Sequence, residues 1–298
     1  MITRRDILKT AGCIAPLLLL PKRGFSQTIG GVSLYHTNDT HSRIDPFQRG
    51  THAGKAGVSR RATLLSRLRA QNNYSLLLDA GDVFQGTPWF NKYHGVVEMQ
   101  MMAALGYDAM TLGNHDFDGG MKGLCAAISN APQLEILCSN YHVEGTCLES
   151  RVRKYNIFKK GPVKIGVFGL GIQLEGLVSQ KLCAGVTYED PRHTANEMVA
   201  LLKEQGCHLI VALSHLGYDG YENEVGDVDW PKDVAGVNYV VGGHTHTLLS
   251  KPDMIKHKDG RWETAVMQVG HSGLWLGAAN FEVSSRSASL KGAGRTQC

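Results

Sequence analysis

The sequence predicts an α/β domain, because short apolar runs typical of strands alternate with amphipathic helical segments along most of the chain. The run Val163–Leu170 is almost uninterrupted and contains glycines, as expected for a strand covered on both faces. Pro191–Glu204 places apolar side chains at helical spacing, which predicts a helix with one buried face. No repeat, low-complexity block or linker divides the 298 residues, so one domain with a large core is expected.

The predicted elements follow one another as strand, loop and helix. Strands are expected at residues 32–35, 75–78, 108–112, 134–139, 163–170, 208–213 and 239–241, and helices at 58–71, 94–105, 120–129 and 191–204. Residues 264–269 and 274–283 alternate apolar and polar side chains, which predicts antiparallel strands at a sheet edge. The tail after Ser284 is rich in Ser, Gly and Lys and is expected to be frayed.

Residues 1–27 have the features of an export signal. The pair Arg4 and Arg5 precedes the apolar stretch 11–20, and small residues near Ser26 suit a signal peptidase. This segment resembles a twin-arginine (Tat) signal, and its apolar stretch is too short for a stable transmembrane helix. We therefore expect export by the Tat machinery to the periplasm or the extracellular space; an uncleaved membrane anchor is the alternative.

Charge and cysteine usage argue against two classes of site. Residues 1–27 contain five Lys or Arg and one acidic residue, so the rest of the chain is nearly neutral and no nucleic-acid partner is expected. The later cysteines form no C-x-x-C pair, which argues against a thiolate zinc site. Disulfides could form in an oxidising compartment, with connectivity left open among Cys125, Cys138, Cys147, Cys183, Cys207 and Cys298. Cys138 and Cys147 are close in sequence, whereas Cys125 and Cys207 are expected to be buried thiols.

Polar side chains follow five of the predicted strands. They are Asp39, His41, Asp82, Asn114, His115, His215, His244 and His246. One such residue is often a turn or cap residue, but five strand ends of this kind indicate a shared site. Carboxylate, amide and imidazole groups without a thiolate suit Mn²⁺, Zn²⁺ or Fe²⁺. The i, i+2 spacing of Asp39 with His41 lets both side chains reach one ion, and the two oxygens of Asp82 could bridge two ions.

These motifs carry a family resemblance. The blocks 36–41, 81–88 and 113–118, with His215 and the pair His244 and His246, resemble those of the calcineurin-like metallophosphoesterases. More narrowly, they resemble the catalytic domain of the bacterial 5′-nucleotidase family, over about residues 32–281. The resemblance implies a four-layer α-β-β-α sandwich with two mixed sheets flanked by helices. With the export signal and the polar tail described above, the chain is expected to divide into a signal peptide at 1–27, a catalytic domain at 28–284 and a tail at 285–298.

The resemblance further implies a role for each matching residue. The first metal ion would be held by Asp39, His41, Asp82 and His246, and the second by Asp82, Asn114, His215 and His244. His115 and Asp118 correspond to the catalytic dyad, with Asn114 and His115 contacting the substrate phosphate. Two divalent ions (Mn, Zn, Fe or Mg) would activate a hydroxide that attacks a phosphate monoester. Asp116 has no implied role and is expected to be a cap or a supporting contact.

The implied substrate is a 5′-nucleotide or a related nucleotide, so nucleotide breakdown outside the cytoplasm is the expected function. Cyclic nucleotides, nucleotide sugars or other phosphate esters are alternatives. Family nucleotidases usually continue into a second domain that binds the base. The chain stops at Cys298, so a separate protein could supply that domain.

Two further alternatives are weaker. A sulfur-ester hydrolase would need extra sequence, and a binding protein with degenerate ligands conflicts with the complete ligand set. Four aromatic residues near the second motif could line a local pocket, although at least half of them are expected in the core: Phe84, Trp89, Phe90 and Tyr93.

Overall fold

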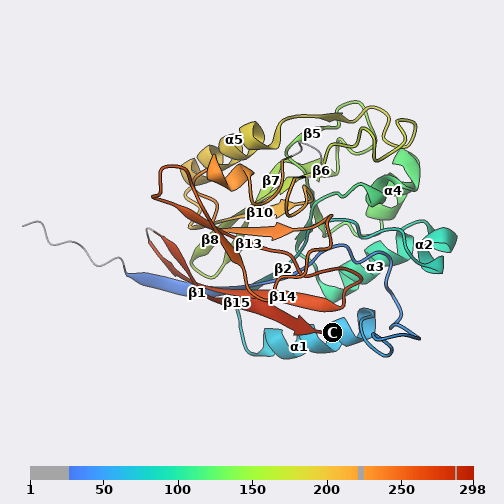
Figure 1. Cartoon of the computed structure of the whole chain (residues 1–298), viewed down its shortest axis with the longest axis horizontal. Helices are drawn as coiled ribbons and strands as arrows, with labels where there is room; N and C mark the ends of the chain where they lie inside the picture. Colours follow the sequence, from blue (N-terminus) through green and yellow to red (C-terminus); the bar gives the residue numbers. More distant parts are fainter. Residues whose placement is uncertain (1–26, 221–224, 286) are drawn as a thin grey trace, which may run out of the picture.

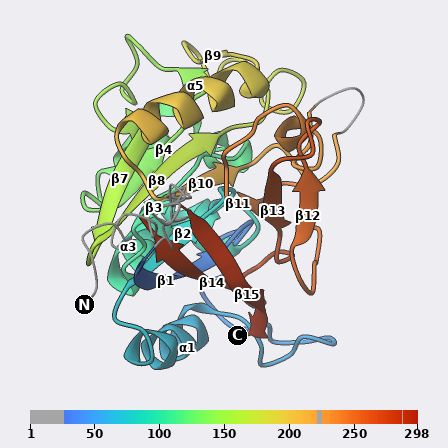
Figure 2. The same cartoon turned by 90° about the vertical axis from the view of Figure 1, so that its left-hand side faces the viewer.

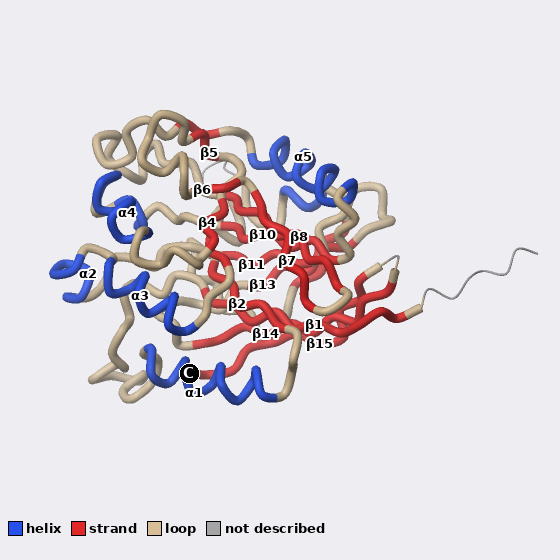
Figure 3. Tube along the Cα trace, turned by 180° about the vertical axis from the view of Figure 1, so that it is seen from behind, coloured by secondary structure: helices blue, strands red, loops and turns tan. Residues whose placement is uncertain are grey.

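Two β-sheets lie face to face between layers of helices in the computed structural model (Figure 1). The model describes residues 27–220, 225–285 and 287–298, so most of the expected export signal lies outside the described residues. Helix α5 covers one side of the sheet pair, and α1 and α3 cover the other (Figures 1 and 3). The predicted four-layer α-β-β-α architecture is confirmed.

The first sheet has seven strands in the order β15–β14–β1–β2–β3–β4–β6. Their bounds are β1 Thr28–Thr37, β2 Ser75–Asp79, β3 Ala109–Met110, β4 Glu135–Leu137, β6 Val152–Arg153, β14 Trp275–Ser284 and β15 Ala288–Gln297. Strands β1 to β4 and β6 run parallel, whereas β14 is antiparallel to both β1 and β15.

The second sheet has six strands in the order β12–β13–β11–β10–β8–β7, and their labels follow one another across Figure 2. Their bounds are β7 Tyr155–Lys160, β8 Val163–Leu170, β10 Leu209–Ser214, β11 Tyr239–Gly242, β12 Asp253–Lys256 and β13 Glu263–Met267. The four central strands are parallel, and the edge strands β7 and β12 are antiparallel to their neighbours. Strands β5 (Tyr141–His142) and β9 (Thr187–Tyr188) form a separate small ribbon.

In the part of the chain that the structure describes, four α-helices begin and end close to the predicted positions, whereas α2 was not predicted. The helices are α1 Val58–Ala70, α2 Pro88–Tyr93, α3 Val96–Leu105, α4 Gly120–Ile128 and α5 Pro191–Glu204, with short 3-10 helices at His115–Phe117 and Trp230–Lys232. Helix α5 starts sharply because the Asp190 carboxylate accepts the backbone N–H groups of Arg192 and His193. Among the described residues, no helix combines the length and apolar character that crossing a bilayer requires.

Three hydrophobic cores fill the spaces between the four layers. On β2, Leu76 and Leu78 point into the core between the sheets, whereas Leu77 points towards α1 and α3. On β10, Val211 faces the core between the sheets and Ile210 faces α5. Because successive strand side chains alternate between faces, each buried strand contributes to two cores. Both sheets are therefore rigid supports for the loops at their carboxyl ends.

Two sequence-based expectations near the C-terminus are wrong. Residues 285–298 are not a frayed tail, because Ala288–Gln297 forms β15 and pairs along β14. Strand β14 is antiparallel to both neighbours, as predicted, but it lies between β15 and β1 rather than at an edge. Strand β13 is also internal, antiparallel to β12 and parallel to β11. The alternation of apolar and polar side chains in these segments correctly predicts strands. Which strands pair with one another depends on contacts between residues that are distant in the sequence.

The cysteine prediction also needs a correction. Cys125 is not a buried thiol; it forms a disulfide with Cys147, with a Cα–Cα distance of 6.2 Å. This bond ties α4 to the loop before β6. Cys138 is free and buried rather than a partner of Cys147. Cys207 is a free thiol as expected, but it is only partly buried.

Candidate functional site

The loops that leave β1, β2, β3, β10 and β11 meet at one end of the sheet pair. Backbone hydrogen bonds join the first two loops, with the Asp39 N–H donating to Gly81 and the His41 N–H to Asp82. The Nδ1–H of His215, after β10, donates to the Ala80 carbonyl, 2.6 Å away on the other sheet. The site is therefore assembled across the junction between the two sheets.

Two groups of potential metal ligands lie in this junction. Asp39, His41 and His246 form one group, and Asp82, His215 and His244 form the other; within each group the ligand atoms lie within 4.8 Å of one another. The groups are adjacent, because Nε2 of His215 is 3.1 Å from Asp82 Oδ2 and 4.0 Å from Asp39 Oδ1. Both sets combine carboxylate and imidazole, the donors that divalent Mn, Fe or Zn accept.

The three remaining predicted residues lie beside these groups. Oδ1 of Asn114 is 3.0 Å from Nδ1 of His244, so the amide adjoins the second group. The His115 ring lies 5.5 Å from the His41 ring, next to the first group. Its Nδ1–H donates to Asp118 Oδ2 at 2.8 Å, since a carboxylate can only accept, and this leaves Nε2 facing outward. All nine predicted residues are therefore together in space.

The residues present fit a metal centre. His41 donates its Nδ1–H to the Phe84 carbonyl, and His215 donates its Nδ1–H to the Ala80 carbonyl. In each ring, Nε2 is therefore the nitrogen that can coordinate a metal ion. Nε2 of His215 is completely buried and faces the Asp82 carboxylate at 3.1 Å. Two buried acceptors that face each other are costly unless a proton or a metal ion lies between them. A cation between the two groups would satisfy both acceptors.

The local electrostatics also favour cation binding. Burial disfavours charge at both Asp82 and His215, yet their mutual attraction lowers the pKa of Asp82 and raises that of His215 to about 10. Burial lowers the pKa of His244 to about 4, so this imidazole is neutral and able to donate its lone pair. The hydrogen bond with Asp39 raises the pKa of His246.

Backbone strain is concentrated in the candidate ligands. Five of them have a positive φ: Asp39, His41, Asp82, His244 and His246. This left-handed conformation is uncommon for residues other than glycine and is held only where surrounding contacts impose it. Here the His244 N–H donates to the Asp39 carboxylate at 3.1 Å and so ties the two sheets together. The sequence shows no sign of this conformation.

Asp116 has a supporting role that sequence reasoning left open. Its completely buried carboxylate accepts four backbone N–H groups, from Gly113 (2.8 Å), Asp82 (3.1 Å), Val83 (3.0 Å) and Phe84 (3.2 Å). It thereby holds the loop after β2 against the loop after β3. Gly113 allows this close approach, because a Cβ there would collide with the Asp82 carboxylate. Burial and the nearby Asp82 charge raise the pKa of Asp116 to about 7.

Two further residues were missed in the sequence. Asn38 donates its side-chain N–H to Asp39 Oδ2 and to the Gly270 carbonyl, both at 2.6 Å, and thus orients Asp39. His271 stacks on His246 with ring centroids 4.8 Å apart. Asn38 could have been found from its place beside Asp39 in the motif. His271 could not, because it approaches from the loop before β14.

The four aromatic residues near the second motif form no pocket around the ligands. Phe84 and Phe90 are buried in the core, stacked with centroids 5.6 Å apart. Trp89 and Tyr93 stack on each other at the surface, at 5.7 Å. The expectation that at least half of them are core residues is confirmed.

Residues 32–248 match the family model for calcineurin-like phosphoesterases. The chain is 33% identical to a snake venom 5′-nucleotidase of Gloydius brevicauda over 287 residues, covering 88% of the chain and 47% of that protein. It is 31% identical over 277 residues to the trifunctional nucleotide phosphoesterase YfkN of Bacillus subtilis, covering 83% of the chain and 18% of that protein. The chain spans about half the length of most of the curated relatives it matches, and less of YfkN.

The comparison with solved structures also finds a 5′-nucleotidase. The 5′-nucleotidase precursor of Thermus thermophilus superposes with a TM-score of 0.79 at 30% identity, covering 89% of the chain and 54% of that chain. The sulfate thiohydrolase SoxB from a Thermus species superposes with a TM-score of 0.74 at only 15% identity, which establishes a shared fold alone.

Proposed function

The chain belongs to the calcineurin-like phosphoesterase family, and from this premise we propose that it is an exported, dinuclear metal-dependent phosphoesterase acting on 5′-nucleotides. The observation that carries the proposal is the pair of adjacent ligand groups with His115 and Asp118 beside them. Phosphoryl transfer needs positioned positive charge and a proton donor. The arrangement supplies candidates for both.

The two ligand groups would hold two divalent metal ions. Asp39, His41 and His246 would bind one ion, and His215, His244 and Asn114 the other, with Asp82 between them. When bound, the ions would neutralise phosphoryl oxygens and lower the pKa of a water molecule. Asp116 and Asn38 would keep the ligands in place through the hydrogen bonds described above.

His115 would act on the substrate rather than on a metal. Asp118 accepts the Nδ1–H, and when Nε2 carries a proton as well, the imidazolium can stabilise the charge that develops on the phosphoryl group or donate the Nε2 proton to the leaving oxygen. The His115 side chain is 39% exposed, so a substrate can reach it. Asp118 would fix the tautomer and orientation of the ring.

Two observations support nucleotides as substrates and export as the route. Relatives at 31–33% identity are named 5′-nucleotidases or a nucleotide phosphoesterase, and three of them are snake venom proteins. The Cys125–Cys147 disulfide suits an oxidising compartment outside the cytoplasm, in agreement with the twin-arginine motif at Arg4 and Arg5.

The test is a hydrolysis panel on metal-analysed protein without residues 1–27. Faster hydrolysis of 5′-nucleotides than of cyclic nucleotides, nucleotide sugars or a chromogenic ester, with the products separated by chromatography, supports the proposal. Hydrolysis of esters other than nucleotides would limit the function to a phosphoesterase of different specificity.

A separate chain that supplies a second domain remains a prediction. Pull-down from the native cell envelope would recover such a partner. Full nucleotidase activity of the lone monomer would exclude the need for it.

A further inference from the structure

Two histidines of one short loop, residues 243–247, belong to different ligand groups. His246 lies in the group with Asp39, and His244 lies in the group with Asp82. Both have a positive φ, of 73° at His244 and 55° at His246. Residues other than glycine keep this conformation only where surrounding contacts impose it. The contacts that hold this histidine loop therefore set the position of one ligand group relative to the other.

Gln268 holds the histidine loop from the interior of the protein. It follows β13 directly, and its side chain is completely buried. The amide N–H₂ donates to the Gly243 carbonyl at 2.5 Å, and Oε1 accepts the Thr247 N–H and, at 3.1 Å, the Thr245 hydroxyl. The Thr247 N–H can only donate and the Gly243 carbonyl can only accept, so these partners fix the orientation of the amide. The three contacts alternate with the two histidines along the chain.

The backbone that follows Gln268 is anchored to the loop after β1. The Val269 N–H donates to Oδ1 of Asn38 at 3.0 Å. The Ser272 N–H donates to the Asp39 carbonyl at 2.7 Å. Gln268 therefore reaches the histidine loop from a segment that is itself fixed beside Asp39, a candidate ligand of the first group.

The Thr245 hydroxyl extends these contacts to the second ligand group. It donates to Gln268 and accepts the Tyr218 N–H at 3.0 Å. Tyr218 lies three residues after His215, a candidate ligand of the second group. One amide is thus connected to loops that carry ligands of both groups.

Gln268 does not contact a substrate, because its side chain has no exposed surface. Residues 265–269 are apolar apart from Gln268, and a buried amide is costly unless its polar atoms are paired. The histidine loop supplies those partners. Any effect of Gln268 on the reaction must therefore pass through His244 and His246.

We propose that Gln268 is a positioning residue that sets the relative position of the two metal ions by holding His244 and His246 in one turn. The proposal rests on the function proposed above, because it requires two resident ions. Without the amide, the Thr247 N–H would lose its acceptor and the Gly243 carbonyl would lose one of its two donors. The loop could then relax from the left-handed conformation at both histidines.

The test replaces Gln268 by Met, which removes the amide and keeps the length of the side chain. Residues that hold metal ligands contribute about ten- to a hundredfold to metal affinity. Both Mn²⁺ ions should therefore bind about ten- to a hundredfold more weakly in calorimetric titrations of chelator-treated Gln268→Met. The electron paramagnetic resonance spectrum of the protein loaded with two Mn²⁺ ions should also change, because the magnetic coupling between two ions depends on the spacing that their ligands impose.

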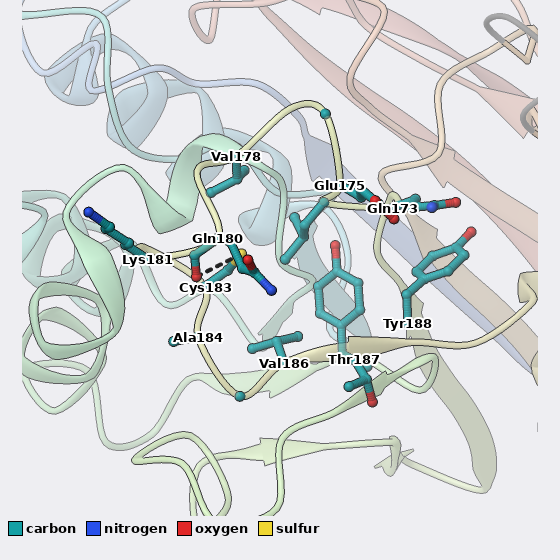
Figure 4. Close-up of a pocket in the computed structure, with 14 residues that line it drawn as sticks. Gln173, Glu175, Val178, Gln180, Lys181, Cys183, Ala184, Val186, Thr187 and Tyr188 are labelled. Atoms are coloured by element: carbon teal, nitrogen blue, oxygen red, sulfur yellow. Dashed lines mark hydrogen bonds between the residues drawn. The ribbon is translucent and has the colours of Figure 1, made fainter.

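Two variants are controls. Thr264→Val removes a buried hydrogen bond, to the Val237 carbonyl at 2.9 Å, near the opposite end of β13. Gln180→Met makes the same change of side chain at an exposed position. Gln180 lines a pocket of about 810 Å³ whose lining includes none of the candidate ligands (Figure 4). Both controls should have the Mn²⁺ affinities and the resonance spectrum of the parent.

Parental affinities and an unchanged spectrum in Gln268→Met would overturn the proposal, as would a lower unfolding midpoint as the only change. Should this variant fail to fold by circular dichroism, Gln268→Glu keeps the acceptor oxygen and loses the donor to Gly243. Its resonance spectrum should still differ from that of the parent, and an identical spectrum refutes the role. Loss of folding in both variants would make Gln268 a residue of the fold and would also overturn the proposal.

These measurements need no substrate, so they separate this proposal from the proposed function. A parent chain that binds two Mn²⁺ ions and hydrolyses no phosphate ester refutes the function, while the affinities and spectra still decide the role of Gln268. A parent chain that hydrolyses 5′-nucleotides, with a Gln268→Met variant that binds both ions equally tightly, refutes only the role of Gln268. A parent chain that binds no Mn²⁺ refutes both.

Discussion

Replacing Asp116 by Asn tests whether the carboxylate that joins two loops also holds the metal ligands. The carboxylate accepts two N–H groups at each oxygen, from Val83 and Phe84 at Oδ1 and from Asp82 and Gly113 at Oδ2. An Asn side chain can keep one such pair, but it turns its own N–H₂ group towards the other. Two buried N–H groups then lack an acceptor.

The cost follows from those two lost bonds. Each buried N–H without a partner costs about 1–3 kcal/mol, so Asp116→Asn should destabilise the joined loops by about 2–6 kcal/mol. Because Asp82 lies in one loop and Asn114 in the other, we expect metal affinity to fall about ten- to a hundredfold. Calorimetric titration of chelator-treated protein with Mn²⁺ at pH 8, where the Asp116 carboxylate is ionised, measures this directly.

Asp190→Asn is the matched control. Asp190 also accepts two backbone N–H groups, but it does so at the start of α5. This variant should bind Mn²⁺ like the parent. Parental Mn²⁺ affinity and turnover in Asp116→Asn would refute the supporting role of Asp116.

Three further predictions address His115, the disulfide and the buried His36. His115→Ala should keep its metal content and lose about 10²–10⁴-fold in kcat, since His115 is not in either ligand group; parental turnover would contradict the mechanism. Cys125→Ser should lower the free energy of unfolding by about 3 kcal/mol in urea titrations, because the Cys125–Cys147 bond spans 22 residues of chain; an unchanged midpoint would contradict this. Burial lowers the pKa of His36 from 6.5 to about 3, so below pH 6.5 the unfolded chain binds a proton that the folded chain does not. Between pH 7 and pH 5, the free energy of unfolding of the parent should therefore fall by about 2 kcal/mol more than that of His36→Gln. Parallel plots of unfolding free energy against pH for the two proteins would refute this assignment.

The strand-end pattern was sufficient to predict the composition of the site. Parallel strands deliver the residues that follow them to one edge, so Asp39, Asp82 and His115 could be grouped without knowing any distance. The family resemblance added the pairing of His115 with Asp118 and the division of the ligands between two ions. The structure brings these residues together, with Nδ1 of His115 lying 2.8 Å from Asp118 Oδ2, and their roles stay predictions.

The missed features depend on contacts between distant parts of the chain. The disulfide partner of Cys125, the pairing of β15 with β14 and the stacking of His271 on His246 each join segments that no local pattern relates. His36 is another case, since its ring fits only because Gly277 on β14 has no side chain. Local propensity predicts elements, whereas these contacts are set by tertiary packing.

The most direct test of the central claim is phosphate release from a 5′-nucleotide during stepwise addition of Mn²⁺ to chelator-treated protein. The two ligand groups predict no release without metal and full activity once about two ions are bound per chain. Phosphate release that is unaffected by chelation, or a chain that binds two ions and hydrolyses no phosphate ester, would contradict the account.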